Sequence, residues 1–205
     1  MKHILCFGDS NTYGCIPFGG RYDDNTRWTR LLANKLGEDY QIIEEGLNAR
    51  TTSLDDPFEP YKNGMEQIIP CLHTHLPVDL TILMLGTNDL KDFFSPSAEK
   101  ISSALHRMAR IIMMVTQAPV LLVSPIHLGD EMADGPCFEL FPPSSIEISK
   151  QLGASIKKVA EDLNIAFMDA ADYAYPDPED SVHLNPKGHA ALAEAFYQKI
   201  LEMNI

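Results

Sequence analysis

His3-Ile4-Leu5-Cys6-Phe7-Gly8-Asp9-Ser10-Asn11, close to the amino terminus, is the stretch that decides the fold. Its apolar residues 4–7 follow one another without a polar interruption, which is typical of a strand buried on both faces of a sheet. Gly8 and Asp9 then end the run, so Ser10 lies at the carboxyl edge of the predicted strand. Open α/β sheets bind their ligands beyond this edge, and Ser10 is therefore the first candidate functional residue.

Further apolar runs of similar length predict the other strands. They cover Gln41–Glu44, Leu80–Leu85, Val120–Val123 and Ile165–Met168. Longer stretches between and after these runs have the spacing of helices. They cover Trp28–Leu36, Met65–His73, Pro96–Thr116, Ile146–Leu163 and Pro186–Met203. The alternation predicts parallel strands joined by right-handed crossovers, in a single doubly wound α/β domain of about five strands over residues 1–205.

Prolines mark three of the predicted helices. Ser95-Pro96 and Asn185-Pro186 each place a capping side chain before a proline whose missing N–H is not needed in the first helical turn. Both pairs therefore predict a helix start. Pro70 lies within the stretch 65–73, and we expect it to kink or end that helix because it removes an internal hydrogen bond.

Two stretches rich in Gly, Pro and Asp do not have the pattern of regular structure. They are Gly14–Asn25 and Gly129–Ser145, and each follows a predicted strand by a few residues. Loops at that end of a sheet often shape a binding site. A plain surface connection is an equally good interpretation of any single residue in them.

Composition and charge exclude several kinds of partner. The formal net charge is −13 and the isoelectric point is near 4.8, without the basic cluster that a nucleic-acid-binding protein needs. An acidic surface also repels anionic lipid headgroups. No apolar run approaches transmembrane length, and no signal peptide precedes the first strand. We therefore expect no nucleic-acid partner, no membrane association and a cytoplasmic location.

The cysteines and histidines do not have the spacing of a metal site. None of the cysteines pair as CxxC or combine with histidines at zinc-ligand spacing, and we expect four reduced thiols. They are Cys6, Cys15, Cys71 and Cys137. His73 and His75 lie at a predicted helix end, where imidazolium complements the helix dipole, so no metal role is needed to explain them.

Asp180-Ser181-Val182-His183, after the fifth predicted strand, offers a base for Ser10. A serine hydroxyl is a poor nucleophile at neutral pH unless an imidazole accepts its proton. The imidazole in turn needs a carboxylate that fixes its tautomer and orientation. An Asp three residues before a His can supply both groups from one turn. Taken alone, the motif is equally well explained as part of an acidic loop before a helix.

Two further strand ends carry groups that acyl transfer needs. Asn88, in Leu85-Gly86-Thr87-Asn88-Asp89, can donate a hydrogen bond from its amide to a developing oxyanion. Gly46, after the second strand, lets the backbone approach a ligand closely, so its N–H is a second candidate donor, with the Ser10 N–H a third. Either loop could instead be an ordinary turn. The combination of four such loops at four strand ends favours a serine hydrolase.

These stretches resemble the four consensus blocks of the SGNH hydrolases, also called the GDSL esterase/lipase family. Gly8-Asp9-Ser10-Asn11 resembles the first block, Gly46-Leu47-Asn48 the second, Gly86-Thr87-Asn88-Asp89 the third and Asp180-Ser181-Val182-His183 the last. The resemblance runs from residue 4 to residue 189. It implies a flavodoxin-like, three-layer α/β/α sandwich that hydrolyses carboxylic esters without a metal or organic cofactor.

Longer strings narrow the resemblance to the arylesterase/acyltransferase subgroup. Arg27-Trp28-Thr29 and Ala49-Arg50-Thr51-Thr52 are among them. The subgroup implies small activated esters, acyl transfer to alcohols, and a homo-oligomer. Residues 11–17 and 137–143 are less similar to it, and those loops are expected to line the entrance and acyl pocket. The candidate pocket residues are Asn11, Phe138 and Phe141, although the two phenylalanines could simply pack their own loop.

The sequence thus predicts a serine esterase that acts on small esters through an acyl-enzyme. Ser10 is the predicted nucleophile, and Asp180 and His183 complete the triad. Asp9 and Arg50 are expected to have structural roles. Alternatives are a carbohydrate O-deacetylase or thioesterase that uses the same site, and a binding domain that lost its activity.

Overall fold

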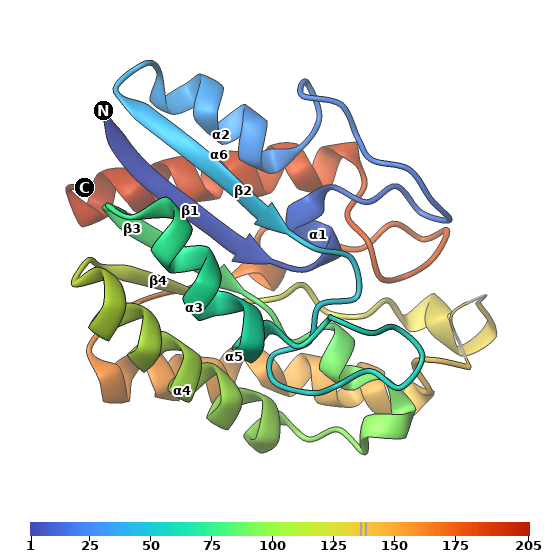
Figure 1. Ribbon diagram of the computed structural model, residues 1–205. Coiled ribbons are helices and arrows are strands. Elements are labelled where there is room, and N and C mark those ends of the chain that lie inside the picture. Colours follow the sequence, from blue (N-terminus) through green and yellow to red (C-terminus); the bar gives the residue numbers. More distant parts are fainter. Residues whose placement is uncertain (136, 138) are drawn as a thin grey trace.

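The core of the protein is a parallel β-sheet, seen in a computed structural model that describes residues 1–135, 137 and 139–205 (Figure 1). Within the described residues the sheet has five strands, in the order β2-β1-β3-β4-β5. They are β1 (Lys2–Gly8), β2 (Tyr40–Gly46), β3 (Leu80–Met84), β4 (Val120–Ser124) and β5 (Ala166–Asp169). Each predicted strand is confirmed, with its ends within two residues of the expected positions.

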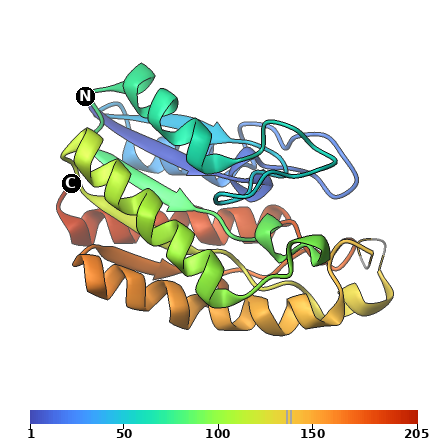
Figure 2. The same ribbon diagram turned by 60° about the horizontal axis from the view of Figure 1, so that its bottom comes forward.

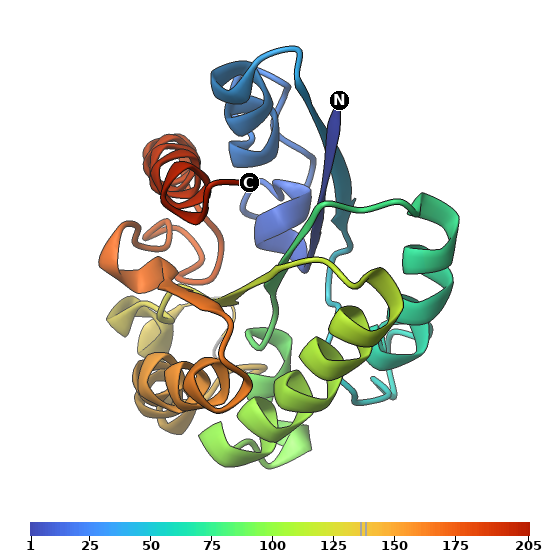
Figure 3. The same cartoon turned by 90° about the vertical axis from the view of Figure 1, so that its left-hand side faces the viewer.

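Helices cover both faces of the sheet, so the architecture is the expected three-layer α/β/α sandwich. Viewed along the sheet, α2 and α6 lie on one face and α3, α4 and α5 on the other (Figure 3). The helices are α1 (Ser10–Tyr13), α2 (Trp28–Leu36), α3 (Gly64–His75), α4 (Ala98–Thr116), α5 (Pro143–Leu163) and α6 (Pro186–Met203). Short 3-10 turns, η1 (Asn88–Leu90), η2 (Asp92–Phe94), η3 (Asp130–Asp134) and η4 (Ala170–Asp172), complete the elements.

Two hydrophobic cores form because successive side chains of a strand point to opposite faces. From β1, Leu5 and Phe7 pack into the core beneath α3, α4 and α5, whereas Ile4 and Cys6 pack beneath α2 and α6. All residues of β3 and β4 are buried, which explains their unbroken apolar runs. Trp28 joins the second core with its ring 4.4 Å from that of Phe196.

Two helices differ locally from the expectations. α3 does not end at Pro70 but continues to His75. Pro70 itself is exposed, while Ile68 and Leu72 on either side are buried and hold the helix against the sheet. α4 begins at Ala98, two residues later than expected, because the hydroxyl of Ser97, not Ser95, accepts a hydrogen bond from the first turn.

Asn185 caps α6 as predicted, since its side chain accepts a hydrogen bond from the Gly188 N–H. α1, a single turn after β1, was not expected from the sequence. Asp9 caps that turn by accepting a hydrogen bond from the Asn11 N–H at 2.9 Å. Asp9 therefore has the structural role predicted for it, and it places Ser10 at the start of α1.

The loops that follow the strands gather at the carboxyl end of the sheet, opposite the end where both termini lie (Figure 2). From β1 the chain first adds β2 on one side of β1, and it then adds β3, β4 and β5 on the other side. The direction of strand addition therefore reverses between β1 and β3. Ligand sites of open α/β sheets form at such a reversal. In the described part of the chain, no helix combines the length and apolar character needed to cross a bilayer.

Candidate active site

Ser10, His183 and Asp180 form one hydrogen-bonded row at the carboxyl end of the sheet. His183 Nε2 lies 2.9 Å from the Ser10 hydroxyl, and its Nδ1 lies 2.5 Å from Asp180 Oδ2. Ser10 and Asp180 are almost fully buried. The structure thus brings together three residues that the sequence places up to 173 positions apart.

The loop that carries His183 is fixed by hydrogen bonds to its neighbours. Asp180 Oδ1 accepts the backbone N–H groups of Val182 and His183, each at 2.9 Å. Asn11 holds the loop from the other side: its amide donates to the Val182 carbonyl at 3.2 Å, and its oxygen accepts the Leu184 N–H at 2.9 Å. Asn11 was expected to line the substrate pocket. Instead, its side chain is buried against this loop.

The charges of the row favour a negative Asp180 beside a positively charged His183. Burial alone would raise the pKa of Asp180, but the hydrogen bonds from His183 hold that pKa below its ordinary value. Burial alone would lower the pKa of His183, but the Asp180 carboxylate, with the Cys15 thiol beside the ring, raises that pKa above its ordinary value. The imidazole is therefore a stronger base than one free in water, as proton transfer from a hydroxyl requires.

Asn88 lines the site of Ser10 from the turn after β3, whereas Gly46, at the end of β2, is not among the residues that line it. The Asn88 amide donates one hydrogen bond to the Arg50 carbonyl at 3.1 Å, which leaves a second N–H on that nitrogen. Gly46 packs directly on α1, since a Cβ built on it would lie 2.2 Å from the Tyr13 nitrogen. The Leu47 N–H points to β1, where it bonds to the Gly8 carbonyl, so the preceding N–H of Gly46 points away from β1.

Arg50 has the structural role that the sequence indicated. Its guanidinium donates to the Gly8 carbonyl at 2.8 Å and to the Glu45 carbonyl, and it stacks 4.0 Å from the centre of the Phe7 ring. It is 4% exposed. Arg50 therefore ties the ends of β1 and β2 together, which fixes Gly46 relative to Ser10.

A cavity of about 220 Å³ opens beside the row. Its lining residues are Ser10, Cys15, Asn48, Ala49, Glu59, Asn88, Lys91, Cys137, Leu140, Phe141, Val182 and His183. Phe141, predicted as a residue of the substrate pocket, is among the residues that line this cavity. Phe138, predicted with it, lies outside the described residues.

Sequence reasoning missed Cys15 and Lys91 as cavity residues. Lys91 is buried and pairs with Asp56 at 2.7 Å. A buried lysine must have such a partner, but nothing in the sequence links positions 35 residues apart in irregular segments. Cys15 could have been noticed from its place five residues after Ser10, in the loop expected to shape the site.

A parallel α/β sandwich that presents serine, histidine and aspartate in one hydrogen-bonded row at its strand ends has the arrangement of a serine-dependent hydrolase. Residues 6–191 match the model of the GDSL-like lipase/acylhydrolase family. The chain belongs to this family, and it is a carboxylic ester hydrolase of the SGNH/GDSL type. A search of curated proteins found no match to it.

Solved structures of three similar proteins superpose on nearly the whole chain. An aryl esterase of M. smegmatis is 33% identical, with a TM-score of 0.94, and the alignment covers 98% of this chain and 99% of that one. A carbohydrate acetylesterase of Sinorhizobium meliloti is 34% identical, with a TM-score of 0.93 and coverage of 99% and 100%. For a putative arylesterase of Agrobacterium tumefaciens these values are 33%, 0.89, 98% and 99%.

Proposed function

We propose that the protein hydrolyses small carboxylic esters through an acyl-enzyme formed on Ser10. His183 is the general base and acid, and Asp180 holds its ring. The continuous row from the Ser10 hydroxyl through the imidazole to the carboxylate, at 2.9 and 2.5 Å, is the observation that carries this proposal. It is the geometry in which a base can take the proton of a hydroxyl as that hydroxyl attacks.

The first half of the reaction acylates the enzyme. Ser10 Oγ forms a bond to the ester carbonyl carbon while its proton moves to His183 Nε2. The carbonyl oxygen becomes an oxyanion, and two donors are proposed for it: the second Asn88 N–H and the backbone N–H of Ser10. The Gly46 N–H, expected from the sequence as a further donor, points away from β1 and therefore away from Ser10 at the end of that strand. Ser10 is the first residue of α1, so its N–H has no partner within that helix. The carbon–oxygen bond of the ester then breaks, and the alcohol leaves with the proton from His183.

The second half releases the acyl group. A water molecule gives its proton to His183 as its oxygen attacks the acyl carbon, and the collapse of the second oxyanion returns the proton to Ser10 Oγ. An alcohol can take the place of water and carry the acyl group away as a new ester. Leu140 and Phe141 give the cavity an apolar lining beside Ser10, on which the alkyl part of an alcohol can bind, and this supports such acyl transfer as a side reaction.

Replacing Asn88 by alanine is expected to lower kcat by about 10²- to 10³-fold, because one oxyanion donor is lost. KM should change little, since this donor acts mainly on the charge that develops in the transition state. Steady-state kinetics with a short p-nitrophenyl ester measure both constants. The control for an intact fold is labelling of Ser10 by a fluorophosphonate. The variant should be labelled more slowly than the wild type, but to completion. An unchanged kcat would remove Asn88 from the oxyanion site.

The size of the cavity indicates a short acyl group. Its volume of about 220 Å³ lies below the range typical of pockets for drug-sized ligands, roughly 300–1,000 Å³. For p-nitrophenyl esters of increasing acyl length, we expect kcat/KM to be highest for acetyl to butyryl and to fall for longer chains. Added alcohol should increase p-nitrophenol release if deacylation limits the rate. A preference for long chains would contradict this account.

Removal of acetyl groups from carbohydrates is a second candidate function. The similarity to a carbohydrate acetylesterase at 34% identity and the small cavity both favour it. Acetate release from a peracetylated sugar, compared with that from an aryl acetate at equal concentration, separates the two candidates. A higher kcat/KM for the sugar would identify the carbohydrate as the preferred substrate class.

A further inference from the structure

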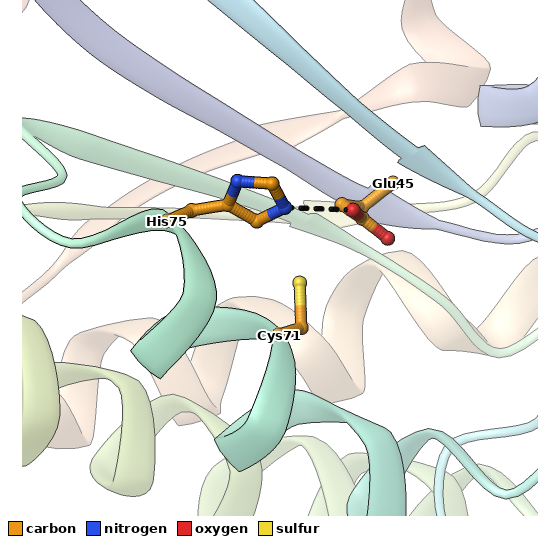
Figure 4. Close-up of side chains that lie close together, drawn as sticks. All are labelled: Glu45, Cys71 and His75. Carbon is orange, nitrogen blue, oxygen red and sulfur yellow. Dashed lines mark hydrogen bonds and ion pairs between the residues drawn. The ribbon is translucent and has the colours of Figure 1, made fainter.

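Outside the site of Ser10, the side chains of Glu45, Cys71 and His75 converge between β2 and α3 (Figure 4). Cys71 and His75 are four residues apart on α3, so both point from the same face of the helix. Glu45 is the penultimate residue of β2, an edge strand of the sheet. Figure 4 shows the imidazole and the carboxylate meeting above the Cys71 sulfur.

The distances in this cluster are close to those of a tetrahedral metal site. One ligand atom from each residue lies within 4.8 Å of the other two, and His75 Nε2 lies 2.9 Å from a Glu45 oxygen. Two ligands of a tetrahedral zinc ion are about 3.3–3.6 Å apart. Side-chain shifts of about 1 Å would therefore place all three atoms around one ion. His75 and Glu45 are 28% and 32% exposed, so both side chains have room to turn and water can reach a fourth position.

The chemistry of these donors selects a borderline-soft divalent ion. Thiolate, imidazole and carboxylate together suit Zn²⁺, whereas Mg²⁺ and Ca²⁺ prefer sites made of oxygen alone. The Glu45 carboxylate and a Cys71 thiolate carry two negative charges, which balance the charge of the ion. Among the described residues, this is the group of three His, Cys, Asp or Glu side chains whose ligand atoms all lie within 4.8 Å of one another.

Two features oppose binding and limit its affinity. Burial and, to a smaller extent, the Glu45 carboxylate raise the pKa of Cys71 to about 12, so the thiol must lose its proton to solvent when the ion binds. The Arg50 guanidinium is the positive charge that faces the cluster, where it partly offsets these effects on the thiol but repels a cation. The divalent ion and its two anionic ligands have a net charge of zero, so the repulsion between the bound ion and Arg50 stays small.

We propose that Glu45, Cys71 and His75 form a binding site for one zinc-type divalent ion, with water as the fourth ligand. This departs from the sequence-based expectation of a metal-free protein, which rested on the spacing of the cysteines and on the position of His75 at a helix end. The ion would join α3 to the end of β2, directly before Gly46. It would stabilise the loop after β2, which contributes Asn48 and Ala49 to the lining of the cavity beside Ser10, without touching the substrate.

Cobalt is the probe that reports the ligands directly, because a thiolate bound to Co²⁺ gives an intense near-ultraviolet charge-transfer band. We expect the reduced wild-type protein to develop this band with one Co²⁺ per chain, and Zn²⁺ to displace the cobalt and abolish it. Cys71→Ser should lose the band. His75→Gln and Glu45→Gln should bind zinc at least about tenfold more weakly in competition with a chromophoric chelator.

Matched controls separate this site from adventitious binding. His73→Gln changes an exposed histidine on the same helix, and Cys137→Ser removes another part-exposed thiol. Both variants should keep the band and the zinc affinity of the wild type. Circular dichroism verifies that each variant is folded. Absence of the band in the wild type, or its loss in Cys137→Ser instead of Cys71→Ser, would overturn the proposal. Because no readout depends on ester hydrolysis, the result is independent of the proposed function.

Discussion

Ser10→Ala is expected to reduce kcat for a short p-nitrophenyl ester by on the order of 10⁴-fold or more, since the hydroxyl proposed to form the acyl-enzyme is lost. The variant keeps Asn88, the backbone N–H of position 10 and the cavity. A residual rate above that of the uncatalysed reaction is therefore expected from binding and oxyanion stabilisation alone. Initial rates over a range of substrate concentrations measure the loss.

The control for Ser10→Ala is its stability. The substitution removes one hydroxyl and its hydrogen bond to His183, so its thermal unfolding midpoint should stay within a few degrees of the wild-type value. A fluorophosphonate should label the wild type at one residue and leave the variant unlabelled. If the folded variant retained full activity, Ser10 would not be the nucleophile.

Asp180→Asn is expected to lower kcat by about 10³- to 10⁴-fold with little change in KM. The amide keeps an oxygen for the N–H groups of Val182 and His183, but it no longer offers a carboxylate to His183 Nδ1. The imidazole then loses the partner that fixes its tautomer and stabilises its charged form. Glu179→Gln is the matched control, because it removes the same charge from an exposed side chain one position earlier.

The pH dependence of Asp180→Asn gives a second measurement. Esterolysis requires the neutral imidazole, so the wild-type kcat/KM should rise as the pH increases through the pKa of His183. Asp180 raises that pKa. The acid limb of the asparagine variant should therefore move to lower pH, although its plateau is lower. A limb that stayed in place would show that Asp180 does not act on His183 in this way.

Much of the fold and the site could be predicted because both depend on local patterns. Unbroken apolar runs identified the strands, and parallel strands end at one edge, so polar groups after β1, β2 and β3 had to lie close together. Long-range contacts in irregular segments were not predictable. The Lys91–Asp56 pair and the contacts of Asn11 with the 180–184 loop depend on how loops fold over the sheet.

Local rules also failed where packing outweighed them. Pro70 should end a helix on propensity alone, but buried neighbours on both sides carry α3 through to His75. That continuation is what places His75 beside Glu45. If α3 ended at Pro70, Cys71 and His75 would not lie on one helical face beside Glu45, and the proposed metal site would not form.

The hydrogen bonds between Asn11 and the 180–184 loop join segments 171 and 173 positions apart. During synthesis on a ribosome, the segment with the proposed nucleophile emerges well before the segment with the proposed base. The nascent chain is consequently expected to be inert toward esters until residues 180–184 have emerged. Contacts of such large sequence separation also close late in folding. The packing of Trp28 on Phe196 joins segments of similar separation, so esterase activity should return no earlier than the burial of Trp28 in a refolding experiment.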